Sequence, residues 1–179
     1  WWQHERHRHE LYHAVGRGHM FERHPKGWDE TAEPLPRVIA MCRHSKTVAM
    51  AFVSNSYVWS EATAVFAVDS PKYLGVLQAN IHVSFAWHTS SRLKSDLRYS
   101  PSDTFAAFPF PSDTEFDRLA PLGEDLHIAR SRICTERGIG LTDLASLLND
   151  SSQQDQSIVD LRELIAALDA AVAAAYGWE

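Results

Sequence analysis

The chain has 179 residues, of which 45% are hydrophobic and 22% are charged. This length and apolar content suit one compact domain with a helical extension, and they exclude a collagen-like or disordered chain. The formal charge of −6 also excludes a uniformly basic protein of the histone type. The charge is uneven, since residues 37–110 carry 7 Lys and Arg against 4 Asp and Glu, whereas residues 111–179 carry 5 against 13. A basic middle therefore precedes an acidic tail.

Two cysteines, Cys42 and Cys134, lie far apart and have no C-x-x-C neighbour. This usage indicates neither a disulfide framework nor a zinc knuckle and fits a reducing cytoplasm. No apolar run is long enough to span a bilayer, and no signal peptide opens the chain, so we expect a soluble cytoplasmic protein without a membrane partner. The chain begins at Trp1 without an initiator Met, which suggests a piece of a longer polypeptide.

The first half of the chain predicts an arm followed by a small sheet. Residues 1–36 combine a short helix over 1–15 with a stretch rich in Gly, His and Pro. Two β-branched, apolar runs at 37–43 and 47–53 predict a hairpin with a tight turn between them. Shorter strands are predicted at 57–59 and 64–68, so the sheet has three or four mostly antiparallel strands.

A helix is predicted to begin at Pro71, after Asp69 and Ser70, and to lie across this sheet. Its apolar positions recur at helical spacing at Leu74, Leu77, Ile81 and Phe85. Residues 89–111 contain three prolines and show no sustained period, so they predict a long ordered loop. A long loop in a compact domain usually carries function.

The acidic tail predicts three helices. The first begins at Pro121 and ends at Gly138, a short one covers 142–148, and Gly177 ends the last. The apolar stripe of the last helix consists of Ile158, Leu161, Ile165, Leu168 and Val172. The fold class is therefore α+β, with a small mostly antiparallel sheet packed by a helix and followed by a helical tail. The predicted parts are an arm at 1–36, a central domain at 37–111 and the tail at 112–179.

Ten histidines raise the possibility of a metal site, and the densest cluster is His4, His7, His9 and His13. His9 and His13 would share a helix face, as two zinc ligands must. The cluster has neither a Glu base in an H-E-x-x-H arrangement nor a cysteine partner, which favours solvated surface histidines. The isolated histidines are expected to be structural; they are His44, His82, His88 and His127.

The residues predict no catalytic site within this chain. No G-x-S-x-G motif, P-loop or cysteine beside a histidine occurs. Gly138-Ile139-Gly140 follows a predicted helix rather than a strand, so it indicates a helix end and not a dinucleotide loop.

The segment Ser91–Asp103 places three cations and a carboxylate within seven residues. If it is extended, Arg92, Lys94, Asp96 and Arg98 project to one side. Lys94 can donate to guanine O6 and N7 while Asp96 accepts from cytosine N4, so the two match one G·C pair in a major groove. Arg92 and Arg98 can contact phosphates. The alternative, which the residues alone favour, is that Lys94 and Asp96 pair with each other on a wet surface.

The connection between the first two strands is a second candidate contact. Its sequence is Arg43-His44-Ser45-Lys46, which can enter a groove or touch phosphates. An ordinary basic turn explains these residues equally well.

Several of these segments together resemble a known family. They are the run from Ile81 through R-L-K-S-D-L-R-Y-S to the F-P-F-P tetrapeptide, the strands from Pro36 to Val53, Gly140-Leu141-Thr142 with Leu147-Leu148-Asn149, and the terminal Y-G-W. In this order they are similar to the C-terminal target-recognition region of MmeI-like (type IIL) restriction–modification enzymes and related adenine-specific DNA methyltransferases. The resemblance extends from about Trp1 to Glu179.

The resemblance implies sequence-specific recognition of double-stranded DNA, which positions an adenine for flipping into a catalytic domain elsewhere in the parent protein. It implies no cofactor in this chain, S-adenosylmethionine in the parent methyltransferase domain, and Mg²⁺ where a nuclease is fused. The family's specificity positions fall on Lys94 and Asp96. The further residues expected to face DNA are Arg43, Ser45, Lys46, Arg92, Arg98, Tyr99 and Ser100.

Two rival functions remain open from the sequence. A protein-interaction domain would dock a partner through its apolar C-terminal helices and would expose an apolar patch along residues 161–172. A histidine-based metal protein would bind metal through the N-terminal cluster. For the DNA-binding hypothesis, we expect the acidic tail to pack against the recognition domain or the parent's catalytic domain rather than face phosphate.

Overall fold

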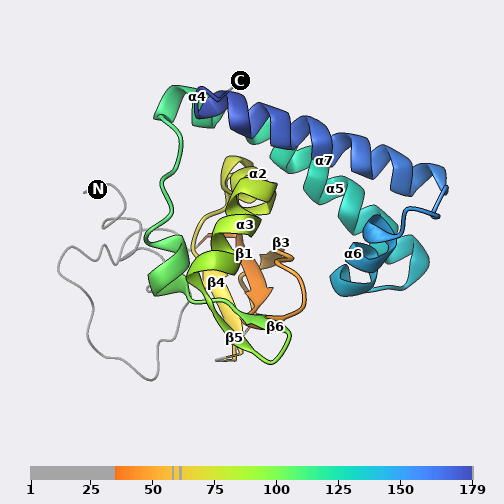
Figure 1. The fold of residues 1–179 in the computed structure, drawn as a ribbon, viewed down its shortest axis with the longest axis horizontal. Coiled ribbons are helices and arrows are strands. Elements are labelled where there is room, and N and C mark those ends of the chain that lie inside the picture. Colours follow the sequence, from red (N-terminus) through yellow and green to blue (C-terminus); the bar gives the residue numbers. More distant parts are fainter. Residues whose placement is uncertain (1–34, 58, 61, 179) are drawn as a thin grey trace.

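The computed structural model describes residues 35–57, 59, 60 and 62–178. In this part of the chain, two small antiparallel sheets lie beside a layer of helices, so the fold is α+β as predicted (Figure 1). The helix expected at 1–15 and the cluster of His4, His7, His9 and His13 lie outside the described residues. A search of the described helices finds none that combines the length and apolar character needed to cross a bilayer.

The first sheet is built around β1 (Arg37–Cys42), which lies between β3 (Ala51–Ser54) and β4 (Thr63–Phe66). Both neighbours pair with β1 in antiparallel register. The predicted hairpin is therefore confirmed, but the tight turn is wrong, because residues 43–50 join the two strands and contribute a strand to the other sheet. The predicted strand at 57–59 is also wrong for Tyr57 and Trp59, which lie outside strands, while residue 58 is not described.

The second sheet has the order β2-β6-β5 and is formed by very short strands. They are β2 (His44–Ser45), β5 (Ser91–Leu93) and β6 (Asp96–Arg98). The prediction of an irregular loop over 89–111 is wrong, because this segment contains the β5–β6 hairpin and a π-helical turn (η1) at Pro101–Phe105. Strands of two or three residues have too little alternation to be visible in the sequence.

The helices are α2 (Pro71–Gln78), α3 (Asn80–Thr89), α4 (Asp113–Asp117), α5 (Ala120–Arg137), α6 (Leu141–Asn149) and α7 (Gln156–Ala175). The three helices of the tail are confirmed, and Gly138 and Gly177 follow α5 and α7 with φ of 62° and 72°. The single helix predicted from Pro71 is instead two helices, since Ala79 is extended between them. The break frees the Asn80 N–H, which donates to Asp169 Oδ1 of α7 at 2.7 Å.

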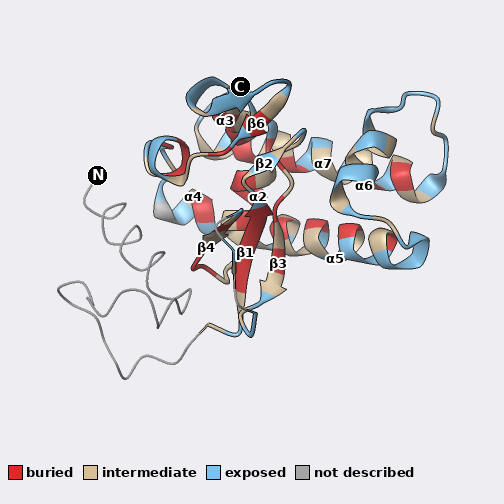
Figure 2. Ribbon diagram, turned by 90° about the horizontal axis from the view of Figure 1, so that it is seen from below, coloured by how far each residue is buried: buried red, intermediate tan, exposed pale blue. Residues whose placement is uncertain are grey.

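Two hydrophobic cores share α2 as their common wall. Leu74 and Leu77 of α2 pack with the sheets, whereas Val76 packs with α5 and α7. Figure 2 shows buried stretches, in red, along β1 and on α5. The backbones of α2 and α5 approach very closely, because a Cβ added to Gly123 would lie 2.0 Å from Pro71 O. Arg37 of β1 also pairs with Glu124 of α5 at 2.9 Å, which holds the pKa of that carboxyl below its usual value. The acidic tail thus packs against the sheet-bearing part, as expected.

The apolar stripe of α7 is part of the second core. Ile158, Leu161, Leu168 and Val172 are all at most 1% exposed. An exposed apolar patch along residues 161–172 was expected for a protein-interaction domain, and this expectation is wrong because α5 and α2 cover the stripe.

Candidate nucleic-acid interface

The β5–β6 hairpin, here called the ribbon (residues 91–98), brings together four of the nine predicted DNA-facing residues, Arg92, Lys94, Asp96 and Arg98. Leu93 lies opposite Asp96, Arg92 opposite Leu97 and Ser91 opposite Arg98, so Lys94 and Ser95 alone form the turn. Residues directly opposite each other share a face of a sheet, and neighbours along a strand alternate between faces. The ribbon therefore has one face with Arg92 and Leu97 and another with Leu93, Asp96 and Arg98.

The face with Leu97 points into the protein. Leu97 is 1% exposed, and Tyr99, which continues the same alternation, is fully buried. The Tyr99 ring packs edge-on against Phe66, and its hydroxyl lies 3.1 Å from His82 Nε2 on α3. His82 Nδ1 lies 2.8 Å from Leu77 O, and a carbonyl only accepts, so Nδ1 carries the proton and Nε2 accepts from Tyr99. Burial lowers the pKa of His82 to about 4, which keeps this imidazole neutral at pH 7.

The opposite face of the ribbon points to solvent. Leu93 is 59% exposed, Arg98 is exposed, and Asp96 is half-buried. β2 extends this face by one strand, because His44 lies opposite Arg98. We call this set, together with the turn residue Lys94, the outer face; its members are His44, Ser91, Leu93, Lys94, Asp96 and Arg98.

The predicted row of Arg92, Lys94, Asp96 and Arg98 on one side is wrong. The two-residue turn reverses the chain after Leu93, so Arg92 lies on the face opposite to Asp96 and Arg98. Its guanidinium reaches the edge of the ribbon and lies 5.6 Å from the centre of the Trp87 ring. Such a cation–π contact holds an arginine over an aromatic face while its outer edge remains in solvent.

Lys94 occupies the first turn position with φ of 58°, a left-handed conformation that a side chain rarely adopts. Both Lys94 and Ser95 are exposed. Among the described residues, Lys94 and Asp96 form no ion pair with each other, and Asp96 Oδ1 instead accepts from Ser95 Oγ at 3.3 Å. The structure thus shows no ion pair between Lys94 and Asp96, which differs from the alternative of a simple surface pair.

The residues around β2 lie at the junction of the two sheets. Arg43 connects them through its backbone, since its N–H donates to Ala62 O and its carbonyl accepts from Tyr99 N–H, both at 2.8 Å. The side chain of Ser45 is half-buried and accepts from Thr47 N–H at 3.2 Å. Lys46 is exposed beside the ribbon.

Two of the predicted DNA-facing residues have internal roles in the structure. Tyr99 is buried and bonded to His82, so the expectation that its side chain touches DNA is corrected. Ser100 is half-buried, and its hydroxyl donates to Asp103 Oδ2 at 2.7 Å. This hydrogen bond connects Ser100 to the first turn of η1.

Two outer-face residues, His44 and Leu93, were not among the predicted site residues. His44 was expected to be structural, yet it is exposed opposite Arg98. A signal for Leu93 exists in the sequence, because a two-residue turn at Lys94-Ser95 places Leu93 beside Asp96. The pairing of His44 has no local signal, since β2 and β6 are far apart along the chain.

Two other features considered from the sequence, a metal site and the Gly-x-Gly sequence, can be compared with the described residues. Across residues 35–57, 59, 60 and 62–178, no three His, Cys, Asp or Glu side chains gather in a way that could hold a metal ion. Gly138 and Gly140 end α5 and begin α6, and Gly140 N–H is capped by Asp143 Oδ2 at 3.4 Å. This confirms the helix end predicted from the Gly-x-Gly sequence.

Comparison with known families gives the chain its relatives. The family model described as MmeI, target recognition domain, matches residues 3–112. The chain belongs to this family. Among solved structures, the type IIL restriction–modification enzyme MmeI in complex with DNA has the same fold, with a TM-score of 0.62 and 21% sequence identity. No curated protein matches the chain.

The structural match covers 83% of this chain but 19% of that MmeI chain. This chain therefore corresponds to about a fifth of the length of the solved enzyme. The matched share is larger than residues 3–112 alone could supply, so the likeness extends from the target recognition domain into the helices of the tail.

Proposed function

We infer that the chain reads a target sequence in double-stranded DNA through the outer face of the ribbon. Membership in the MmeI target recognition domain family supports the class of function. The observation that carries the assignment to the ribbon is its two-sidedness: Leu97 is locked in the core while Lys94, Asp96 and Arg98 face solvent. A two-stranded ribbon of this width can enter a major groove.

Within this proposal, Lys94 and Asp96 read the two edges of one G·C pair. The Lys94 ammonium donates to guanine O6 and N7, and the Asp96 carboxylate accepts from cytosine N4. Arg98 lies on the same face and Arg92 at the edge of the ribbon, so both can reach flanking phosphates. The positive φ of Lys94 supports the assignment, because strained backbone at an exposed turn persists where a side chain must be aimed.

The test exchanges donor and acceptor in the variant Lys94→Glu with Asp96→Arg. We expect DNA binding to be retained with an altered preference at a single base pair, measured by competition against duplexes that differ at each position. A matched control is Lys72→Asp with Asp117→Lys, which exchanges the charges of an ion pair away from the ribbon. An unchanged preference in the ribbon variant would remove Lys94 and Asp96 from base readout.

We further propose that the chain is part of a longer adenine-N6 methyltransferase whose catalytic domain is its intramolecular partner. S-adenosylmethionine would be bound by that domain, and Mg²⁺ would be needed only where a nuclease is fused. Gly138 and Gly140 end α5 and begin α6, so this Gly-x-Gly pair does not fit a cofactor loop that follows a strand. We expect methyl transfer to DNA from the longer polypeptide and none from this chain alone, measured with labelled S-adenosylmethionine.

A further inference from the structure

A groove of about 520 Å³ separates the sheet-bearing part of the molecule from its tail. The loop at 46–49, α2 and α3 form one wall, and α5, α6 and α7 form the other. Lys46 and Trp87 lie in the first wall. Lys46 directly follows β2, which pairs with the ribbon, and the Trp87 ring contacts Arg92, so this wall of the groove adjoins the ribbon.

Arg130 of α5 places a buried positive charge in this groove. It is 8% exposed, and Nη1 donates to the neutral Gln78 Oε1 at 2.5 Å. Among the described residues Arg130 forms no ion pair, so most of its five N–H donors have no protein acceptor. Burial lowers the pKa of its guanidinium to about 10, so it remains a cation at neutral pH. None of its nitrogens is among the fully enclosed atoms that have no hydrogen-bond partner, so the unpaired N–H donors face the groove, where an anion can accept from them.

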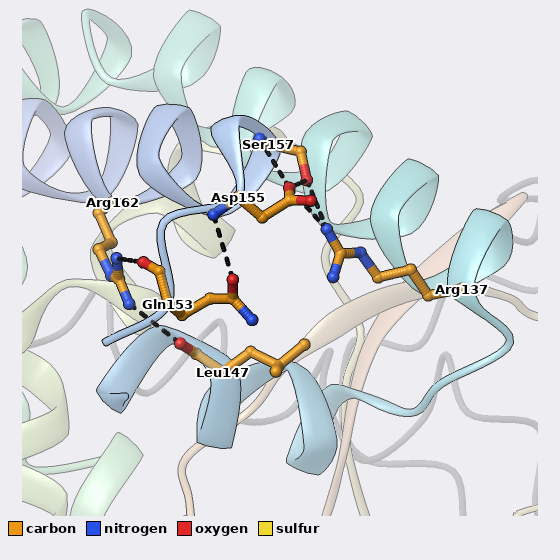
Figure 3. A network of polar contacts seen from close by, with 6 residues as sticks. All are labelled: Arg137, Leu147, Gln153, Asp155, Ser157 and Arg162. Atoms are coloured by element: carbon orange, nitrogen blue, oxygen red, sulfur yellow. Dashed lines mark hydrogen bonds and ion pairs between the residues drawn. The ribbon is translucent and has the colours of Figure 1, made fainter. Parts of the chain in front are cut away.

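The two other charged groups that the tail contributes to the groove, Arg162 and Asp169, already have protein partners. Arg162 of α7 donates to four backbone carbonyls, of Leu147, Leu148, Asp150 and Gln153, and so caps the C-terminus of α6; Figure 3 shows two of these contacts. Asp169 accepts from the backbone and side-chain N–H groups of Asn80 at 2.7 and 2.5 Å. Neither Arg162 nor Asp169 therefore neutralises Arg130.

We propose that this groove receives one phosphate of the bound DNA backbone, with Arg130 inside it and Lys46 at its rim. The proposal rests on the DNA-binding function inferred above. A guanidinium fork can donate to two phosphate oxygens at once, and the groove wall that contains Lys46 and Trp87 adjoins the ribbon. The site would give the otherwise acidic tail one cationic contact with DNA and would fix the angle at which the ribbon enters the groove of the duplex.

A pair of neighbouring alanines on α7 tests the proposal. Ala166 and Ala167 are both exposed, but only Ala166 lines the groove. In Ala166→Glu the new carboxylate can neutralise Arg130 and repel a phosphate, whereas Ala167→Glu adds the same charge outside the groove. We expect Ala166→Glu in the full chain to weaken binding to duplex DNA about tenfold more than Ala167→Glu does. The slope of log affinity against log salt concentration should also be smaller in Ala166→Glu, by about one released counterion. Equal effects of the two variants would overturn the proposal.

Removal of the cation itself gives a second, independent measurement. Arg130→Gln is compared with Arg132→Gln, an exposed arginine on the same helix that does not line the groove. We expect a shallower salt dependence in Arg130→Gln only, with the same change on every duplex sequence. A change in base-pair preference without a change in salt dependence would contradict a phosphate contact.

Inorganic phosphate separates failure of this proposal from failure of the DNA-binding function. At matched ionic strength, phosphate is expected to raise the Tm of the wild-type chain relative to chloride by more than it raises that of Ala166→Glu, because phosphate also stabilises both proteins non-specifically. If the chain does not bind DNA but its Tm still responds to phosphate in this way, the DNA-binding function is wrong, and DNA phosphate is not the ligand of the groove. The anion site itself would then still be supported. If DNA binding depends on salt but is equally strong in Ala166→Glu and Ala167→Glu, only the groove assignment is wrong. That result would favour an acidic side chain of an adjoining domain as the ligand of the groove.

Discussion

The ribbon and helix α7 show two different relations between packing and surface. Each strand of the ribbon has three residues, and the pair contributes only Leu97 to the core, with Tyr99 directly after it. Helix α7 has 20 residues and buries four apolar side chains along one stripe. The ribbon is thus held in place by a few inward contacts. The residues of its outer face do not contribute to the core, so they can serve binding without affecting the packing of the fold. The helix is committed to packing, so its sequence is constrained by stability.

This difference suggests that mutations where α2, α5 and α7 pack together change stability, whereas mutations on the outer face change DNA binding. The groove at Arg130 lies between the sheet-bearing part and the tail, and there a tail residue is expected to affect binding. Mutations that change stability without changing DNA binding, or the reverse, test this division.

The largest effect is expected at the crossing of α2 and α5. In Gly123→Ala the new Cβ would lie 2.0 Å from Pro71 O, a backbone atom that cannot move without separating the helices. We expect a loss of at least about 2 to 3 kcal/mol in the free energy of unfolding, measured by urea denaturation. Gly75→Ala is the control, because its closest contact is the end of the Leu168 side chain at 3.3 Å. If Gly123→Ala lowers the free energy of unfolding no more than Gly75→Ala does, this account of the α2–α5 crossing is wrong.

An effect of similar size but different origin is expected at low pH. His82 titrates near its ordinary pKa of 6.5 in the unfolded chain and near 4 in the folded one. Between these values the unfolded state binds more protons, so stability falls as the pH decreases from 6.5 to 4, by about 3 kcal/mol in total. Urea denaturation of the wild type and His82→Gln at pH 7 and pH 4.5 measures this contribution. An equal loss of stability in both proteins over this range would exclude His82 as its source.

The smallest stability effect, and the sharpest test of the comparison, is expected at the turn of the ribbon. Lys94→Gly relieves the left-handed backbone and should stabilise the fold by up to about 1 kcal/mol. The same change removes the ammonium and should weaken binding to the preferred DNA sequence. Opposite signs in denaturation and in DNA binding would show that Lys94 serves recognition; a variant that loses stability or keeps full affinity would contradict this role.

Much of the helical part could be predicted because its signals are local. The stripe of α7 repeats over several turns, and Gly138 and Gly177 follow the helices that they were expected to end. The division of α2 from α3 could not be predicted in this way. At Ala79 the backbone is extended, and the N–H of Asn80 donates to Asp169 of the distant helix α7 instead of to a carbonyl of α2.

The site was predictable in its chemistry but not in its geometry. The sequence R-L-K-S-D-L-R indicates donors and acceptors suited to DNA, and the exposure of Lys94 agrees with that expectation. The face on which each side chain lies depends on the position of the turn, and a turn at Lys94 and Ser95 separates Arg92 from Asp96 and Arg98. Tyr99 continues the same apparently polar segment, yet its ring completes the core.

By itself the sequence determined the helices of the tail, the β1–β3 pairing, the split between basic and acidic regions and the residue types available for recognition. These features follow from local periodicity, capping and composition, which act between residues close along the chain. Only the tertiary structure decided that β2 pairs with β6, that one face of the ribbon is buried, and that Arg130 lies in a groove between two regions. Those outcomes depend on contacts between distant segments, whose register and burial are set when the cores assemble.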